Sequence, residues 1–251
     1  MVKARGSWSD MDNEWIEEYK RRILPYYKEM RNNQKVVDID KKKSLSFFCT
    51  QWGRNWQPGG ILFVGRATNG WGDGIDIDKL PFNEPDQMDW VITQGMDSSK
   101  AWRASRSPFW RVIKGVAQRF HASEWQTHIA WSNLCKCSFL ESGNPSDPLF
   151  YATVEPCKKI LGIDIEMLKP RAIVMLTEAN LVNALTNHGW SGCFVDCLVD
   201  EVAPKDFSHS GCSVKVLDND KYRIIVSERP EYRPEQPRIE CIAAAISEVR
   251  G

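Results

Sequence analysis

Residues 60–71 read GILFVGRATNGW, and this stretch decides the fold. An apolar run between two glycines, Gly60 and Gly65, predicts a short, fully buried strand of the type found in parallel sheets. The run breaks at once into a polar loop, residues 66–73. Because ligands of open α/β sheets bind just beyond the carboxyl ends of such strands, this loop is the first candidate for a functional site.

The same pattern, an apolar run that ends in a polar residue, recurs along the chain. It appears at residues 127–134, 171–177 and 222–227. Segments with helical patterns accompany these runs, at residues 107–121, 153–168, 178–188 and 237–249. This alternation predicts an α/β fold, a three-layer α/β/α sandwich with a central, mainly parallel four-stranded sheet.

The N-terminal part of the chain has a different character. Residues 13–33 carry apolar side chains at helical spacing, which predicts an amphipathic helix with a break near Pro25. We expect residues 1–57 to form a helical extension that packs on an α/β domain of residues 58–251. Within that domain, residues 66–106 are expected to form a long loop, and loops of this length are often lids or binding loops.

The charge of the chain is balanced, and its sequence shows no sign of export or of membrane insertion. Lys and Arg total 33, and Asp and Glu also total 33, so no global field draws the chain to nucleic acid. The sequence shows neither a signal peptide nor an apolar run of membrane-spanning length. The eight cysteines are then expected to be reduced. We therefore expect a cytoplasmic protein without a membrane partner. Separately, we expect it to be a monomer.

Several short segments, taken in order, resemble the uracil-DNA glycosylase superfamily. Gly65-Arg66-Ala67-Thr68-Asn69 stands where that superfamily has its first motif. Asn133-Leu134-Cys135-Lys136-Cys137 is similar to the Asn-x-x-Lys-Cys strand end of the thermostable bacterial and archaeal branch. Residues 157–174 resemble that branch's Cys-x-x-x-Leu … Leu-x-Pro-x-x-Ile-Val stretch. The resemblance covers about residues 58–250 and rests on the order and spacing of the motifs.

The resemblance implies a pocket for a flipped base. Asn133 would read the pairing edge of a pyrimidine with its amide, or would simply close the sheet end. Aromatic side chains would form the walls, as they do around flipped bases in general. The base-binding residues implied in this way are Gly65, Arg66, Thr68, Trp71, Phe109, Trp110 and Asn133.

Two departures from the family pattern fall at expected catalytic positions. Ala67 stands where relatives carry Asp, Asn or Glu to orient the attacking water. Three explanations are open. Another side chain orients the water, the protein has lost the chemistry, or Ala67 replaces a natural carboxylate. Asn69 and Asp73 are the nearest substitutes. Arg229 replaces the catalytic-loop His and would stabilise a departing base anion or clamp a phosphate.

Two further segments are candidates for contact with DNA. Arg106 and Ser107 precede a predicted helix start, a natural phosphate site, although a solvated helix end has the same pattern. The loop after the last predicted strand contains Pro230, Tyr232 and Arg233. In relatives this loop fills the gap left by the flipped nucleotide; the alternative is a proline-rich connector.

The cysteines do not match the cluster set of the thermostable branch. In that branch, cysteines aligned with Cys137 and Cys157 help hold an iron–sulfur cluster that an N-terminal pair completes. Here Cys49 stands alone on that side, and a cluster needs four thiolates. We expect no cofactor and no metal.

The sequence thus predicts a monofunctional DNA glycosylase that hydrolyses an N-glycosidic bond and leaves an abasic site. Its partner would be DNA, either a duplex with a flipped nucleotide or a single strand. The base would be uracil or a modified pyrimidine. The drift of the motifs and the long loop favour a modified pyrimidine, such as a phage hypermodified base. Excision of such a base would imply a role in anti-phage defence. The first alternative is a non-catalytic reader of modified or damaged bases. The second is a nucleotide hydrolase, although no Gly-x-x-x-x-Gly-Lys-Ser/Thr loop is present.

Overall fold

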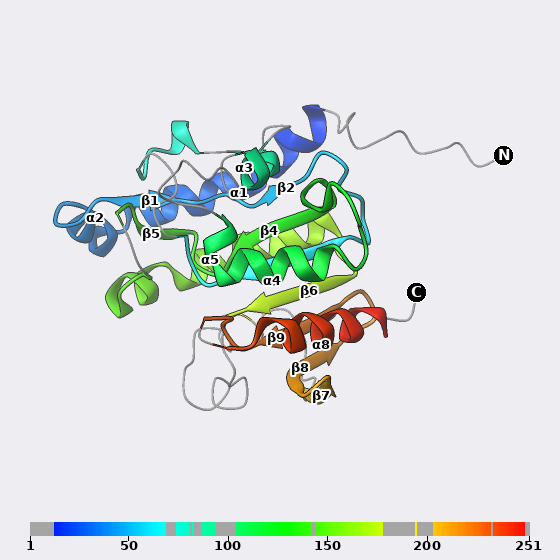
Figure 1. The fold of residues 1–251 in the computed structure, drawn as a ribbon. Helices are drawn as coiled ribbons and strands as arrows, with labels where there is room; N and C mark the ends of the chain where they lie inside the picture. The colour runs from blue at the N-terminus through cyan, green and yellow to red at the C-terminus, as the bar shows by residue number, and fades with distance from the viewer. Residues whose placement is uncertain are drawn as a thin grey trace.

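The fold is built on a seven-stranded mixed sheet with helices on both faces (Figure 1). The computed structural model describes residues 13–68, 74–80, 87–93, 104–141, 144–177, 203–231 and 233–248, together with Phe82 and Phe194. The strand order is β2-β4-β3-β6-β9-β8-β7. A separate two-stranded ribbon pairs β1 with β5.

The strands of the large sheet are short, and its four central members run parallel. These are β4 (Ile129–Asn133), β3 (Ile61–Gly65), β6 (Ala172–Leu176) and β9 (Arg223–Ser227). The antiparallel edges are β2 (Gln51–Trp52) on one side and the hairpin of β7 (Lys205–His209) and β8 (Cys212–Asp218) on the other. The ribbon consists of β1 (Leu45–Phe47) and β5 (Cys137–Phe139).

Helices cover the sheet in two layers (Figure 1). One face packs against α1 (Asn13–Asn32), α2 (Gln34–Asp40) and α5 (Asp147–Leu168). The other face packs against α3 (Trp90–Thr93), α4 (Pro108–Ala117) and α8 (Glu235–Ser247). Alternate residues of β3 and β4 therefore enter opposite cores, since successive side chains of a strand point to opposite faces.

The predicted α/β class is confirmed, and the four predicted apolar runs are the four parallel strands. The sheet has seven strands rather than four because three antiparallel strands extend its edges. Helix α4 begins as predicted, with Ser107 as N-cap and Pro108 in the first turn. Helix α5 ends at Leu168 as predicted but begins at Asp147, before the predicted start at 153. The predicted helix at 178–188 lies outside the described residues.

Two expectations about the N-terminal part need correction. Helix α1 continues through Pro25 without a break. Its buried face, which includes Tyr19, Ile23 and Tyr27, packs into the core, and this burial outweighs the roughly 3 kcal/mol that an interior proline costs. Residues 45–52 of the expected helical extension also contribute strands, because β2 joins the large sheet beside β4.

Candidate functional site

The carboxyl ends of β3 and β4 form a corner in which Gly65 lies directly opposite Asn133. Beyond this pair the two chains stay together: the Leu134 amide donates to the Gly65 carbonyl at 2.9 Å, and the Cys135 amide donates to the Arg66 carbonyl at 3.0 Å. The loop after β3 and the turn after β4 are thus held side by side. The structure therefore brings together two of the motifs that the sequence singled out.

Gly65 is required at this corner by the side chains around it. A Cβ atom at Gly65 would collide with Asn133 Oδ1 and would lie 3.2 Å from both Cε2 and Cζ of Phe109. Phe109 comes from the first turn of α4, on the same face of the sheet. Three predicted base-binding residues, Gly65, Phe109 and Asn133, therefore meet at one point.

The amide of Asn133 is buried and incompletely bonded. Its residue is 1% exposed, and within the described chain its Nδ2 atom has no hydrogen-bond partner. An unpaired buried amide donor costs about 1–3 kcal/mol, so native proteins rarely keep one without a reason. An acceptor oxygen brought to this corner would satisfy the donor.

Trp110 packs in the apolar core and does not line the corner. It is 5% exposed and packs edge-on against Trp90 and Trp131, with ring centroids 5.5 and 5.0 Å apart. Its neighbour Phe109 is only partly buried and makes an edge contact with it at 5.4 Å. Of the two predicted walls, Phe109 is therefore the one that lies beside Gly65.

Two residues of the loop after Gly65, Ala67 and Thr68, contact neighbouring parts of the fold. The Thr68 hydroxyl is 2.7 Å from Ser138 Oγ, and the residue is 3% exposed, so this bond fastens the loop to β5. Ala67 is partly buried and packs against the apolar core on the α1 and α5 side. The described part of the corner, Gly65–Thr68 with Phe109 and Asn133, contains no carboxylate.

The predicted DNA-contact loop after β9 is braced by ion pairs. Arg229 is exposed and bonds Glu231, with its Nη2 atom 3.1 Å from Oε1. Arg233 is also exposed and pairs with Glu228 at 3.2 Å. Pro230 is buried. Arg229 is therefore held by a carboxylate within its own loop, and both arginines are presented at the surface.

Arg238, which the sequence did not single out, anchors this loop from α8. It is 4% exposed and donates through Nη1 to the Glu228 carbonyl at 2.6 Å and to Ser227 Oγ at 2.9 Å. An arginine on an otherwise apolar helix face is the signal that could have identified it.

The N-terminus of α4 keeps the features that predicted a phosphate site. Ser107 is the N-cap, but its side chain makes no capping hydrogen bond, so the first-turn amides are not satisfied by it. Arg106 is exposed beside it. Arg111, one turn later, chelates the Glu235 carboxylate with Nη2 at 2.6 Å and Nε at 2.9 Å. This pair joins the first turns of α4 and α8.

Four of the predicted site residues, namely Asn69, Trp71, Asp73 and Tyr232, lie outside the described part of the chain. The two candidates for orienting water at this corner are among them. The geometry of water activation therefore stays a prediction.

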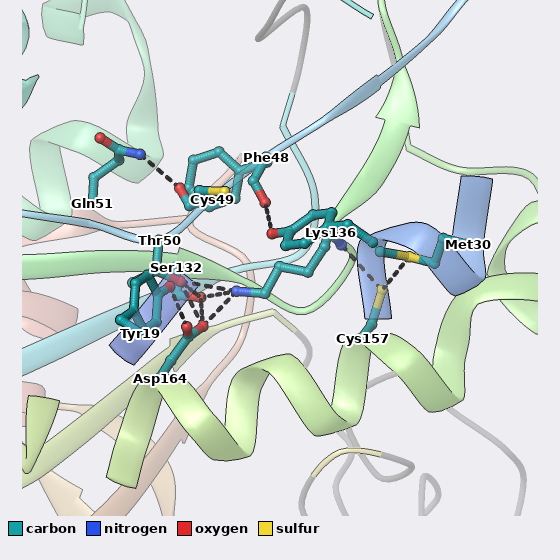
Figure 2. A network of polar contacts seen from close by, with 11 residues as sticks. Tyr19, Met30, Phe48, Cys49, Thr50, Gln51, Ser132, Lys136, Cys157 and Asp164 are labelled. Carbon is teal, nitrogen blue, oxygen red and sulfur yellow. Dashed lines mark hydrogen bonds and ion pairs between the residues drawn. The ribbon is translucent and has the colours of Figure 1, made fainter. Parts of the chain in front are cut away.

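A buried polar network that the sequence did not predict lies on the other face of β4 (Figure 2). Lys136 and Asp164 are fully buried, and Lys136 Nζ is 2.7 Å from Asp164 Oδ2. Nζ also donates to Thr50 Oγ1 at 2.9 Å and to Ser132 Oγ at 2.5 Å. Tyr19 of α1 donates to Asp164 Oδ1 at 2.7 Å.

The cysteines around this network are protonated thiols. Burial raises the pKa of Cys135 and Cys137 well above the usual value, and it raises the pKa of Cys157 to about 11. Among the described residues, no group of three or more His, Cys, Asp or Glu side chains is arranged to hold a metal ion. No helix in the described ranges is both long enough and apolar enough to cross a bilayer.

Neither a protein-family model nor a curated protein sequence matches this chain.

Proposed function

We propose that this protein is a monofunctional DNA glycosylase that hydrolyses the N-glycosidic bond of a flipped pyrimidine and leaves an abasic site. The observation that carries the proposal is the meeting of Gly65, Asn133 and Phe109 at the carboxyl ends of two parallel strands. A glycine where a side chain would collide, a buried amide with a free donor, and an aromatic ring together suit a planar base with polar edge groups.

Each of the three residues has a distinct part in this mechanism. The free Nδ2 donor of Asn133 binds a carbonyl oxygen of the base, and its Oδ1 atom accepts from a ring N–H. The Phe109 ring stacks on the base. Because Gly65 has no side chain, the Asn133 amide and the Phe109 ring have room to occupy these positions. The fold we propose for the four parallel strands is accordingly that of the uracil-DNA glycosylases.

Bond cleavage gives the sugar oxocarbenium character and the base negative charge. Arg229, or backbone amides of the loop after β3, would stabilise the departing base. Because Gly65–Thr68, Phe109 and Asn133 provide no carboxylate, Asn69 or Asp73 would orient the water, or a carboxylate at position 67 would do so in a fully active form. Loss of one such positioned group costs about 100- to 1,000-fold in rate.

The contacts with DNA would come from two segments that carry exposed arginines, Arg106 and Arg233. Arg106 and the first turn of α4 would bind a phosphate, since helix N-termini attract anions. The loop with Pro230, Tyr232 and Arg233 would enter the duplex or follow a single strand. Its bracing by Arg238 supports this role, because a stiff loop loses less conformational freedom on binding.

The base is uracil or, as favoured here, a modified pyrimidine. Thr68 and Asn69 stand where relatives that discriminate against thymine carry a Pro-Tyr pair, and the Thr68 hydroxyl is bonded to Ser138. A phage hypermodified base would make the protein a cytoplasmic defence enzyme.

A second candidate function is a non-catalytic reader of modified or damaged bases. One observation favours it: Ala67 packs on an apolar core, and the described corner contains no carboxylate to orient water. A reader would keep Asn133 and Phe109 for recognition and would leave the glycosidic bond intact.

Detection of abasic sites separates the two functions. The protein, Ala67→Asp and Ala67→Glu are incubated with uracil-containing DNA and with genomic DNA of phages that carry modified pyrimidines, and alkali then breaks abasic strands. Strand breaks that a carboxylate at position 67 restores or enhances would support the glycosylase and identify its base class. Selective binding without breaks in any version would leave the reader.

A further inference from the structure

The buried network around Lys136 lies in the same short segment as Asn133. Lys136 Nζ has three protons and three acceptors: Thr50 Oγ1, Ser132 Oγ and Asp164 Oδ2. Asp164 Oδ2 also accepts from Thr50 Oγ1 at 2.5 Å. Figure 2 shows the Lys136 side chain reaching across to Asp164 on α5, with Ser132 and Thr50 at the point where they meet.

The chain positions of these residues bracket the proposed base reader. Ser132 precedes Asn133 and Lys136 follows it by three residues, so the network holds both flanks of the turn. Side-chain alternation places Ser132 toward α5 and Asn133 toward α4. The network therefore fixes the backbone of Asn133 from the opposite face of the sheet and leaves its amide free.

Backbone bonds hold the rest of this turn. The Lys136 amide donates to Cys157 Sγ at 3.3 Å, and the Lys136 carbonyl accepts from the Phe48 amide at 2.9 Å. Leu134 and Cys135 are bonded to the loop after β3, as described above. From Ser132 to Lys136, Nδ2 of Asn133 is the buried side-chain nitrogen or oxygen atom left without a partner in the described structure.

Stability alone does not account for a fully buried charge pair. Taking two charges out of water is costly, and apolar residues of similar volume at such sites are often neutral or stabilising. A pair that is retained and fully hydrogen-bonded suits a role in fixing one conformation. The conformation that it fixes here is that of the turn which carries Asn133.

We propose that Lys136 and Asp164 are positioning residues that hold the side chain of Asn133 in the place that base recognition requires. The proposal rests on the proposed function of the corner. Thr50 and Ser132 complete the network, and Tyr19 adds α1 to it through Asp164 Oδ1. Neither charged residue touches the base; both act through the backbone of residues 132–136.

The test is the double variant Lys136→Met with Asp164→Leu, which removes both charges and keeps apolar volume. Its control is Glu166→Gln, which breaks a surface ion pair between the same helix, α5, and Arg22 of α1. We expect the double variant to stay folded and to lose about 10- to 100-fold in excision kcat/KM. Binding to abasic product DNA, which offers no base to Asn133, should stay unchanged, as it should in the control.

A double-mutant cycle tests whether the network acts through Asn133. Adding Asn133→Ala to the charge-free variant should cost much less than Asn133→Ala costs alone, because both changes disable the same group. Additive losses would overturn the proposal. So would full excision activity in the charge-free variant.

A measurement without turnover keeps the proposal distinct from the proposed function. The side-chain amide resonances of Asn133, assigned with Asn133→Asp, are recorded by ¹⁵N-edited NMR. We expect them to shift and broaden in the charge-free variant and to stay unchanged in Glu166→Gln; unchanged resonances in both would overturn the positioning role. If the wild-type protein excises no base, the proposed function fails while this result still stands. Should the double variant not fold, Tyr19→Phe, which removes one hydrogen bond to Asp164, gives the same comparison with a smaller effect.

Discussion

Gly65 and Asn133 face each other across the parallel register of β3 and β4, and the absent side chain of one leaves room for the amide of the other. The pair joins two motifs that are 68 residues apart in the chain. It places a free hydrogen-bond donor beside an aromatic ring at the edge of the sheet where α/β proteins bind ligands.

Gly65→Ala tests the shape of this corner. The new Cβ would displace Asn133 Oδ1 and press on Phe109, and a displacement of about 1 Å in a positioned group can cost about 100-fold in rate. We expect excision kcat/KM to fall by about that factor. The matched control is Gly162→Ala in α5, where a Cβ meets nothing within 4 Å. This control should keep activity and gain up to about 1 kcal/mol in stability. Equal activity of the two variants would contradict the account.

Asn133→Ala should separate activity from stability. Because the Nδ2 donor is unpaired in the described structure, its removal relieves a buried polar group and leaves the free energy of unfolding within about 1 kcal/mol of wild type. Excision should fall by at least about 100-fold. Asn55→Ala, which removes a 3.0 Å bond to Thr127 Oγ1 near the amino end of β4, is the control and should keep activity. Urea unfolding and single-turnover excision measure the two effects; a large stability loss in Asn133→Ala would instead assign Asn133 a structural role.

Arg238→Lys tests the anchor of the loop after β9. A lysine cannot hold both Ser227 Oγ and the Glu228 carbonyl with the same planar geometry. We expect a loss of about 1–3 kcal/mol in stability and weaker binding to DNA. The control Arg119→Lys alters an exposed ion pair between the turn after α4 and Glu240 of α8, and it should change stability by less than about 0.5 kcal/mol. Fluorescence anisotropy with labelled DNA reports the affinity, and an unchanged affinity would separate this loop from DNA binding.

Alkaline pH should destabilise the fold through its buried thiols. Burial raises the pKa of Cys49 to about 12 and that of Cys157 to about 11, from an ordinary value of 9.0. Above pH 9 the unfolded chain loses these protons while the folded chain keeps them, so stability is present below pH 9 and falls as pH rises. The slope reaches about 1.4 kcal/mol per pH unit for each thiol. Urea unfolding at pH 8, 9 and 10 should show this loss, and Cys49→Ala should reduce it. A flat profile would contradict the assigned shifts.

Much of the fold could be predicted from the sequence because buried parallel strands are continuous apolar runs. The run ending at Gly65 and the run ending at Asn133 both have this pattern, and both are central strands. The edge strands were missed for a physical reason: β7 is mostly exposed and lacks an apolar run, and β2 is only two residues long. Pro25 misled the prediction of α1 because tertiary burial overrides local propensity.

The candidate site could be predicted only in part. Gly65, Asn133 and Phe109 were identified by motif and position, and they do lie together. Lys136 and Asp164 were not paired because nothing local in the sequence connects a turn with a helix 28 residues later. Burial of Trp110 in an aromatic core likewise depends on contacts with Trp90 and Trp131 that spacing does not reveal.

The most direct test of the central claim is detection of the released base. The protein and its Asn133→Ala variant are incubated with uracil-containing DNA and with DNA carrying modified pyrimidines, and free bases are identified by mass spectrometry. The account predicts one pyrimidine released by the wild type, in amounts equal to the abasic sites formed, and at least about 100-fold less by Asn133→Ala. Release of no base by the wild type or by its Ala67→Asp and Ala67→Glu versions, or equal release by Asn133→Ala, would contradict it.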